Sequence, residues 1–109
     1  MKTKIASVTT LLMAITFAST ANAISVNSVT CANPALFVNL SASTWDKITH
    51  QDLYVRGTNS SGYSWTLSES IDVGTGVHYY FNFGDTPIGD FVNYTIFTPQ
   101  TNLGSGSCN

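Results

Sequence analysis

Hydrophobic and polar residues alternate along several stretches of the chain, with the period of two that a half-buried β-strand requires. The clearest run is 63–68, where Tyr63, Trp65 and Leu67 alternate with serine and threonine. One face of this run is therefore expected to be buried and the other exposed to solvent, with Trp65 as a large core aromatic. The pattern predicts further strands, the first weak and 71–73 short, at 24–29, 36–42, 53–56, 71–73, 77–83 and 92–96.

Turn-forming residues separate these runs. The Asn-Ser-Ser-Gly cluster at 59–62 predicts a hairpin, and the segment 84–90 is rich in the turn formers glycine, aspartate and proline. No window after residue 23 keeps the apolar spacing of a helix, so we expect no long helix. Six or seven short strands predict an all-β domain, a small antiparallel β-sandwich that is immunoglobulin- or fibronectin-like by analogy of pattern. A small β-barrel is the alternative.

The first 23 residues have the three parts of a cleaved secretory signal peptide. Lys2 and Lys4 precede the apolar stretch 5–18, and Ala21-Asn22-Ala23 matches an A-x-A cleavage site. The apolar stretch is shorter than the roughly 20 residues of a spanning helix, so a retained anchor is the weaker alternative. We therefore expect a secreted or periplasmic protein, with a single domain at 24–109 and no membrane anchor after cleavage.

The only two cysteines, Cys31 and Cys108, lie near the two ends of that domain. In an oxidising compartment they have one intramolecular pairing, which predicts a structural disulfide that ties the tail to the first strand. Without a C-x-x-C spacing, neither thiol is poised for exchange. A lipid on Cys31 is a poor alternative, because residues 28–30 do not match a lipidation site.

Charge argues against nucleic acid as a partner. Residues 24–109 contain two basic and six acidic side chains, a net charge of −4 with neutral histidines, which would repel phosphate backbones. The abundant aromatic and β-branched residues argue against disorder. We expect a monomer whose partner, if it has one, is a protein or a glycan.

No catalytic or cofactor motif stands out, so we expect neither an enzyme nor a cofactor. The chain has no G-x-S-x-G elbow, and only His50 or His78 could act as a base for a serine. Either histidine is expected to be a solvent-facing strand residue, and a metal site between them is not suggested. The turn 84–90 offers Asp85 and Asp90 as calcium ligands, although these carboxylates equally suit turn amides.

Aromatic side chains give the other lead, because several lie out of phase with the expected core. Exposed aromatics can stack on sugars or anchor a protein partner, and the alternative is packing at the sheet edges. The residues concerned are Phe37, Trp45, Tyr54, Tyr80 and Phe97. With the two aspartates, Trp45, Tyr54 and Tyr80 are the candidate contact residues. Asn39, Asn59 and Asn93 match N-x-S/T acceptors, but about as many are expected by chance.

Two classes of function fit this sequence. The first is an exported non-catalytic binding module, such as an adhesion, inhibitor or partner-binding domain, with carbohydrate binding as one form. The second is a subunit of an extracellular polymer that assembles through its sheet edges.

Overall fold

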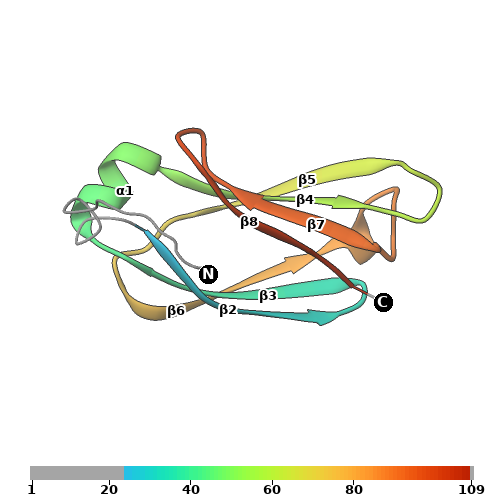
Figure 1. Cartoon of the computed structure of the whole chain (residues 1–109), viewed down its shortest axis with the longest axis horizontal. Coiled ribbons are helices and arrows are strands. Elements are labelled where there is room, and N and C mark those ends of the chain that lie inside the picture. The colour runs from blue at the N-terminus through green and yellow to red at the C-terminus, as the bar shows by residue number, and fades with distance from the viewer. Residues whose placement is uncertain (1–23, 109) are drawn as a thin grey trace, which may run out of the picture.

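The structure, a computed structural model, describes residues 24–108, so the predicted signal peptide lies outside the described residues. Seven strands form two antiparallel sheets, which pack face to face (Figure 1). The three-stranded sheet has the order β2-β3-β6 and consists of β2 (Ser25–Ala32), β3 (Ala35–Ala42) and β6 (Gly74–Asn82). The four-stranded sheet has the order β5-β4-β7-β8 and consists of β4 (Asp52–Thr58), β5 (Ser64–Ser70), β7 (Asn93–Phe97) and β8 (Asn102–Ser107).

The predicted fold class, an all-β antiparallel sandwich, is confirmed, with two separate sheets and not one closed barrel. In a constant-type immunoglobulin domain the fourth strand joins the sheet of the first two strands. Here the fourth strand, β5, pairs with β4 and becomes an edge of the other sheet. As a result β5 and β6 are edge strands of the two different sheets and lie on the same side of the sandwich.

The core lies between the two sheets and follows the predicted alternation. On β3, Leu36, Val38 and Leu40 point inward, and Leu36 is paired with Phe81 of β6. On β4, side chains at alternate positions share a face, and Leu53 and Val55 of that face belong to the same core cluster. The most deeply buried members are Leu36, Val38, Leu40, Leu53, Val55, Ile71, Phe81, Phe83, Phe91 and Ile96.

The predicted short strand at 71–73 is wrong. These residues carry the chain from β5 in one sheet to β6 in the other, so they have no neighbouring strand to pair with. Ile71 is nevertheless fully buried, and its amide donates to the Gln51 carbonyl over 3.2 Å. The apolar residues therefore reflect burial of a crossover and not a strand.

Two elements were not expected from the pattern. The short helix α1 (Thr44–His50) follows β3, so His50 is a half-buried helix residue and not the solvent-facing strand residue we expected. The tail forms β8, which pairs with β7 and not with the first strand. Its glycines and serines contribute little to the core, and the backbone ladder with β7 holds it in place.

The predicted disulfide is confirmed. Cys31 of β2 is bonded to Cys108, which follows β8, across 77 residues of sequence, with 5.8 Å between the Cα atoms. Since β2 and β8 are edge strands of different sheets, the bond closes one side of the sandwich. The Cys108 amide adds a 2.8 Å hydrogen bond to the Val92 carbonyl. The opposite side, between β5 and β6, has no such closure among the described residues. We call it the open side, and the side with the disulfide the closed side.

Candidate functional site

A groove of about 400 Å³ lies between β5 and β6, on the side of the sandwich opposite the disulfide. It is lined by residues of β5, of β6 and of the 3₁₀ turn η4 (Phe83–Asp85) that follows β6. Its polar and aromatic lining residues are Trp65, Ser68, Glu69, Tyr80, Phe81, Asn82, Asp85 and Thr86.

The groove exists because the inward face of β5 is incompletely covered. In an antiparallel pair, residues opposite each other share a face, and Leu67 is opposite the buried Val55. Leu67 packs against the core, so Trp65 and Glu69, two positions to either side, lie on the same inward face. Trp65 is nevertheless 45% exposed. The predicted inward face of this strand is correct, but the prediction of Trp65 as a core residue is wrong. The four-stranded sheet packs on a sheet of only three strands, so its edge strand β5 is not fully covered.

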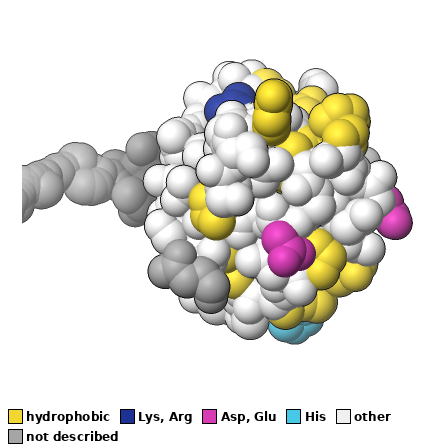
Figure 2. All heavy atoms as spheres, turned by 90° about the vertical axis from the view of Figure 1, so that its right-hand side faces the viewer, with side chains coloured by type: hydrophobic (Ala, Val, Ile, Leu, Met, Phe, Trp, Pro, Cys, Tyr) yellow, Lys and Arg dark blue, Asp and Glu magenta, His cyan; other side chains and the backbone are white. Residues whose placement is uncertain are grey.

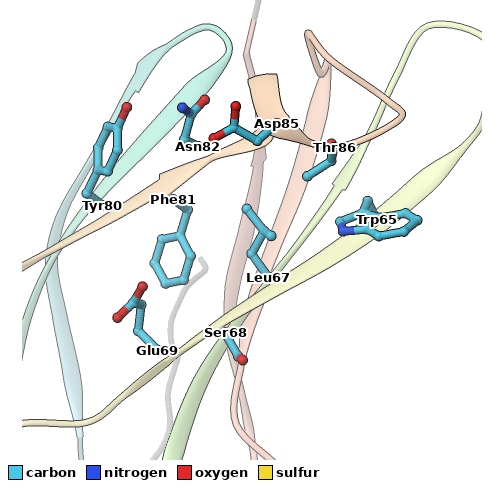
Figure 3. A pocket seen from close by; sticks show the side chains of 9 residues that line it. All are labelled: Trp65, Leu67, Ser68, Glu69, Tyr80, Phe81, Asn82, Asp85 and Thr86. Atoms are coloured by element: carbon cyan, nitrogen blue, oxygen red, sulfur yellow. The ribbon is translucent and has the colours of Figure 1, made fainter.

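Aromatic and aliphatic groups make the floor and the two sides of the groove. Figure 3 shows Trp65 on the β5 side and Tyr80 on the β6 side, with Leu67 and Phe81 between them. Tyr80 lies on the outer face of β6, opposite in direction to Phe81, so it borders the groove only at its rim. Phe81 is only 1% exposed and belongs to the core, whereas Tyr80 is 53% exposed. The Tyr80 ring also lies 5.1 Å from the ring of Phe37 on the neighbouring strand, which restrains it at the rim. A ligand would therefore meet aromatic surface without any rearrangement of the core.

The charged groups of the groove are both acidic. Glu69 and Asp85 line it, and neither forms an ion pair with a side chain of residues 24–108. The two basic residues of this part of the chain lie elsewhere. The Lys47 Nζ donates to the Ile71 carbonyl, and the Arg56 guanidinium lies 5.0 Å from the centre of the Phe97 ring. The groove thus combines aromatic surface with uncompensated negative charge.

Charged side chains are few in the described part of the chain, with two basic and six acidic residues. The end of the domain in Figure 2 shows apolar and acidic side chains separated by uncharged polar atoms, with little basic surface. Against this background, two carboxylates beside one groove produce a local negative potential.

A short turn fixes the position of Asp85 in the groove. The Asn82 side chain accepts a 2.8 Å hydrogen bond from the Gly84 amide and begins η4. The Thr86 amide and hydroxyl both donate to the Phe83 carbonyl, over 3.0 and 2.7 Å. Asp85 therefore projects from a turn that is held at both ends, and it does not supply those turn hydrogen bonds itself.

The structure brings two of the predicted contact residues, Tyr80 and Asp85, to the groove and leaves three outside it. Trp45 lies on α1 and is 58% exposed. Tyr54 lies on the outer face of β4, where its ring stacks on Phe97 with 5.4 Å between centroids. Asp90 is exposed in the loop before β7. Tyr54 thus has the edge-type packing that we considered for it.

The two histidines are in unrelated surroundings. His78 lies on the outer face of β6, where its ring contacts the Asn39 side chain at 3.2 Å. His50 ends α1, and its Nδ1 is 3.9 Å from the buried Asp46 carboxylate. Among residues 24–108, no three histidine, cysteine, aspartate or glutamate side chains are grouped as metal ligands.

Two groove residues were missed from the sequence. Trp65 was assigned to the core, and Glu69 was not selected at all. The alternation that placed Trp65 and Leu67 on one face also places Glu69 there, so a carboxylate on a predicted inward face was the available signal.

Comparison with protein families, with curated proteins and with solved structures gives no match for this chain. Within the described residues, no helix is long and apolar enough to cross a membrane. The disulfide indicates an oxidising compartment outside the cytosol.

Proposed function

We propose that this protein is an exported, non-catalytic binding module, secreted or periplasmic, and that the groove between β5 and β6 holds its ligand. The observation that carries this proposal is the half-exposed Trp65 on the inward face of an edge strand, beside the carboxylates of Glu69 and Asp85, which form no ion pair within residues 24–108. Such a large aromatic surface facing solvent is typical of ligand and partner contacts. The disulfide on the opposite side supports a scaffold role for the closed half of the sandwich.

Two exposed tryptophans provide a matched test of this site. Trp65→Ala removes the groove aromatic, and Trp45→Ala removes an equally large exposed side chain on α1. The oxidised domain would be presented to the native extracellular or periplasmic fraction and, in parallel, to a glycan array. We expect the retained partner or glycan to be lost with Trp65→Ala, by more than about tenfold, and kept with Trp45→Ala. The reverse pattern, or no retention by the unaltered domain in either assay, would contradict the proposal.

The second candidate is a subunit of an extracellular polymer, and the free edges of β5 and β6 favour it. Unpaired backbone groups on an edge strand are able to pair with a strand of another chain. Analytical ultracentrifugation of the oxidised domain over a wide concentration range separates the two candidates. Growing oligomers would support the polymer subunit, and a monomer at all concentrations would support the binding module.

A further inference from the structure

We propose that the groove binds an extended segment of another protein, which adds as an antiparallel strand to the free edge of β5 and places a basic side chain against Glu69. This inference rests on the proposed function and names the ligand class of the same site. The expected partner is a protein segment that contains lysine or arginine, because the negative charge of the groove, its aromatic lining and the regular β5 edge all favour such a segment.

The β5 edge is the most regular of the four sheet edges. Its seven residues pair with β4 in unbroken register, from Asp52 with Ser70 to Thr58 with Ser64. Natural edge strands are usually blocked by a bulge, a proline, a lysine, an inward-pointing charge or a covering element. The β5 sequence has no proline, no lysine and no bulge. Its one charge, Glu69, faces inward and would oppose a strand that brings no cation to it, so it selects for a basic partner. A regular edge of this kind offers a row of backbone donors and acceptors to an incoming strand.

The other three edges are irregular. The pairing of β6 with β3 shifts register between Leu40 and Ala42, and Gly76 of β6 has a φ of 67°. The register of β2 shifts between Val26 and Ser28, and the disulfide ties this strand down. The β7–β8 pairing shifts between Ile96 and Phe97, and Gly104 of β8 has a φ of 148°. Bulges and left-handed glycines distort an edge and discourage pairing. Distortions that discourage strand addition are therefore found on the other three edges and not on β5.

The inward face of β5 predicts the side chains of the added strand. Residues directly opposite in an antiparallel pair lie about 4.5–5.5 Å apart at Cβ and interact. An antiparallel segment read from its N-terminus would place successive inward residues opposite Glu69, Leu67 and Trp65. A basic, an aliphatic and an aromatic residue, each separated by one outward residue, complement these three positions. Asp85 lines the same groove and adds to its overall negative potential.

Charge disfavours a second copy of this chain as the occupant. The four edge strands contain no lysine or arginine, because Lys47 lies in α1 and Arg56 in the central strand β4. Pairing of one copy's edge with another copy's β5 would thus bring no cation to Glu69. It would also bring together two domains of net charge −4. The complementary partner is a different, basic chain.

The test is selection from a displayed library of random nine-residue peptides against the oxidised domain, with the Trp65→Ala variant as the counter-selecting protein. We expect enrichment of peptides with lysine or arginine two residues before an aliphatic residue, and depletion of proline in the same window. The best peptide is then measured against Glu69→Gln and against the matched control Asp90→Asn, an exposed acid outside the groove. Glu69→Gln should weaken binding by about two- to fivefold, as for one exposed ion pair, and Asp90→Asn should not.

N-methylation of that peptide separates strand addition from simple side-chain docking. In a strand, alternate amides point to opposite edges, so only one alternate set faces β5. Methylating this set should lower affinity by more than about tenfold, and methylating the other set should leave it unchanged. Equal effects of the two sets would overturn strand addition.

The outcomes also separate this inference from the proposed function. A library that yields no binders, or yields acidic ones, overturns the inference. If neutral glycans instead bind and are lost with Trp65→Ala, the groove is a carbohydrate site, and only the proposed function survives. If the partner or glycan that the unaltered domain retains binds equally well to Trp65→Ala and is lost with Trp45→Ala, both proposals fall.

Discussion

Tyr79 shows how one buried polar group ties the crossover to the core and makes stability depend on pH. Its ring is 5% exposed, and its hydroxyl accepts a 2.8 Å hydrogen bond from the Asp72 amide. Burial raises the pKa of Tyr79 above its ordinary value of about 10, the Asp72 amide lowers it, and the Asp72 and Glu69 carboxylates raise it. The folded protein therefore binds this proton more tightly than the unfolded chain does.

The stability that comes from the raised pKa is complete below pH 10 or so and is lost as the pH rises from there through the folded pKa. We expect the unaltered domain to lose free energy of unfolding above this pH more steeply than Tyr79→Phe does. At pH 8 the variant should be less stable by about 1 kcal/mol, for the lost hydrogen bond. Urea unfolding at pH 8 and at pH 10.5 checks both statements, and a constant difference between the two proteins would contradict the first.

Gly57 shows how a small residue in a central strand makes room for a large one. It lies on the inward face of β4, and a Cβ atom at this position would be 2.9 Å from the Phe83 ring. Phe83 fills the space that a side chain would need. We expect Gly57→Ala to destabilise the domain by about 1–3 kcal/mol, the usual range for overpacking. Ser68→Ala, on the exposed edge, is the control, and equal midpoints of chemical unfolding for the two variants would disprove this packing account.

At the scale of elements, the strands with strict alternation were predictable and the irregular elements were not. β3, β6 and β7 have apolar residues on one face, so their existence and their inward faces followed from the sequence. α1 lacks a sustained apolar stripe because it is only seven residues long. β8 is held by backbone pairing, which leaves no apolar signature. The groove was missed because exposure of Trp65 depends on which strand lies opposite, and alternation does not report that.

A capping box does mark the start of α1 in the sequence. The Ser43 side chain accepts from the Asp46 amide over 3.2 Å, and the Asp46 carboxylate accepts from the Ser43 amide over 2.9 Å. Ser43→Ala should lower the free energy of unfolding by about 1 kcal/mol, because a helix amide loses its partner. Thr44→Ala, one position later, should cost less. Thermal unfolding of both variants measures the difference, and a larger loss for Thr44→Ala would exclude the capping role.

At the scale of the whole molecule, the disulfide and the groove divide the sandwich into a closed and an open side. The bond closes a loop of 77 residues, which stabilises by about 4–5 kcal/mol in the chain-entropy model. Small domains have a net stability of roughly 5–15 kcal/mol, so this is a large share. We expect the double variant Cys31→Ser and Cys108→Ser to lose about 4–5 kcal/mol in chemical denaturation. A loss below about 1 kcal/mol would show that the bridge is not the main support.

The claim that the open side is the binding surface is tested most directly by amide hydrogen exchange of the oxidised domain, with and without the partner, glycan or peptide that it retains. Exchange slows where backbone amides become covered or paired. We predict that slowing is concentrated in β5 and in the part of β6 and η4 that lines the groove. Slowing at α1 around Trp45, or on the outer face around Tyr54 and Phe97, with β5 unchanged, would contradict the account.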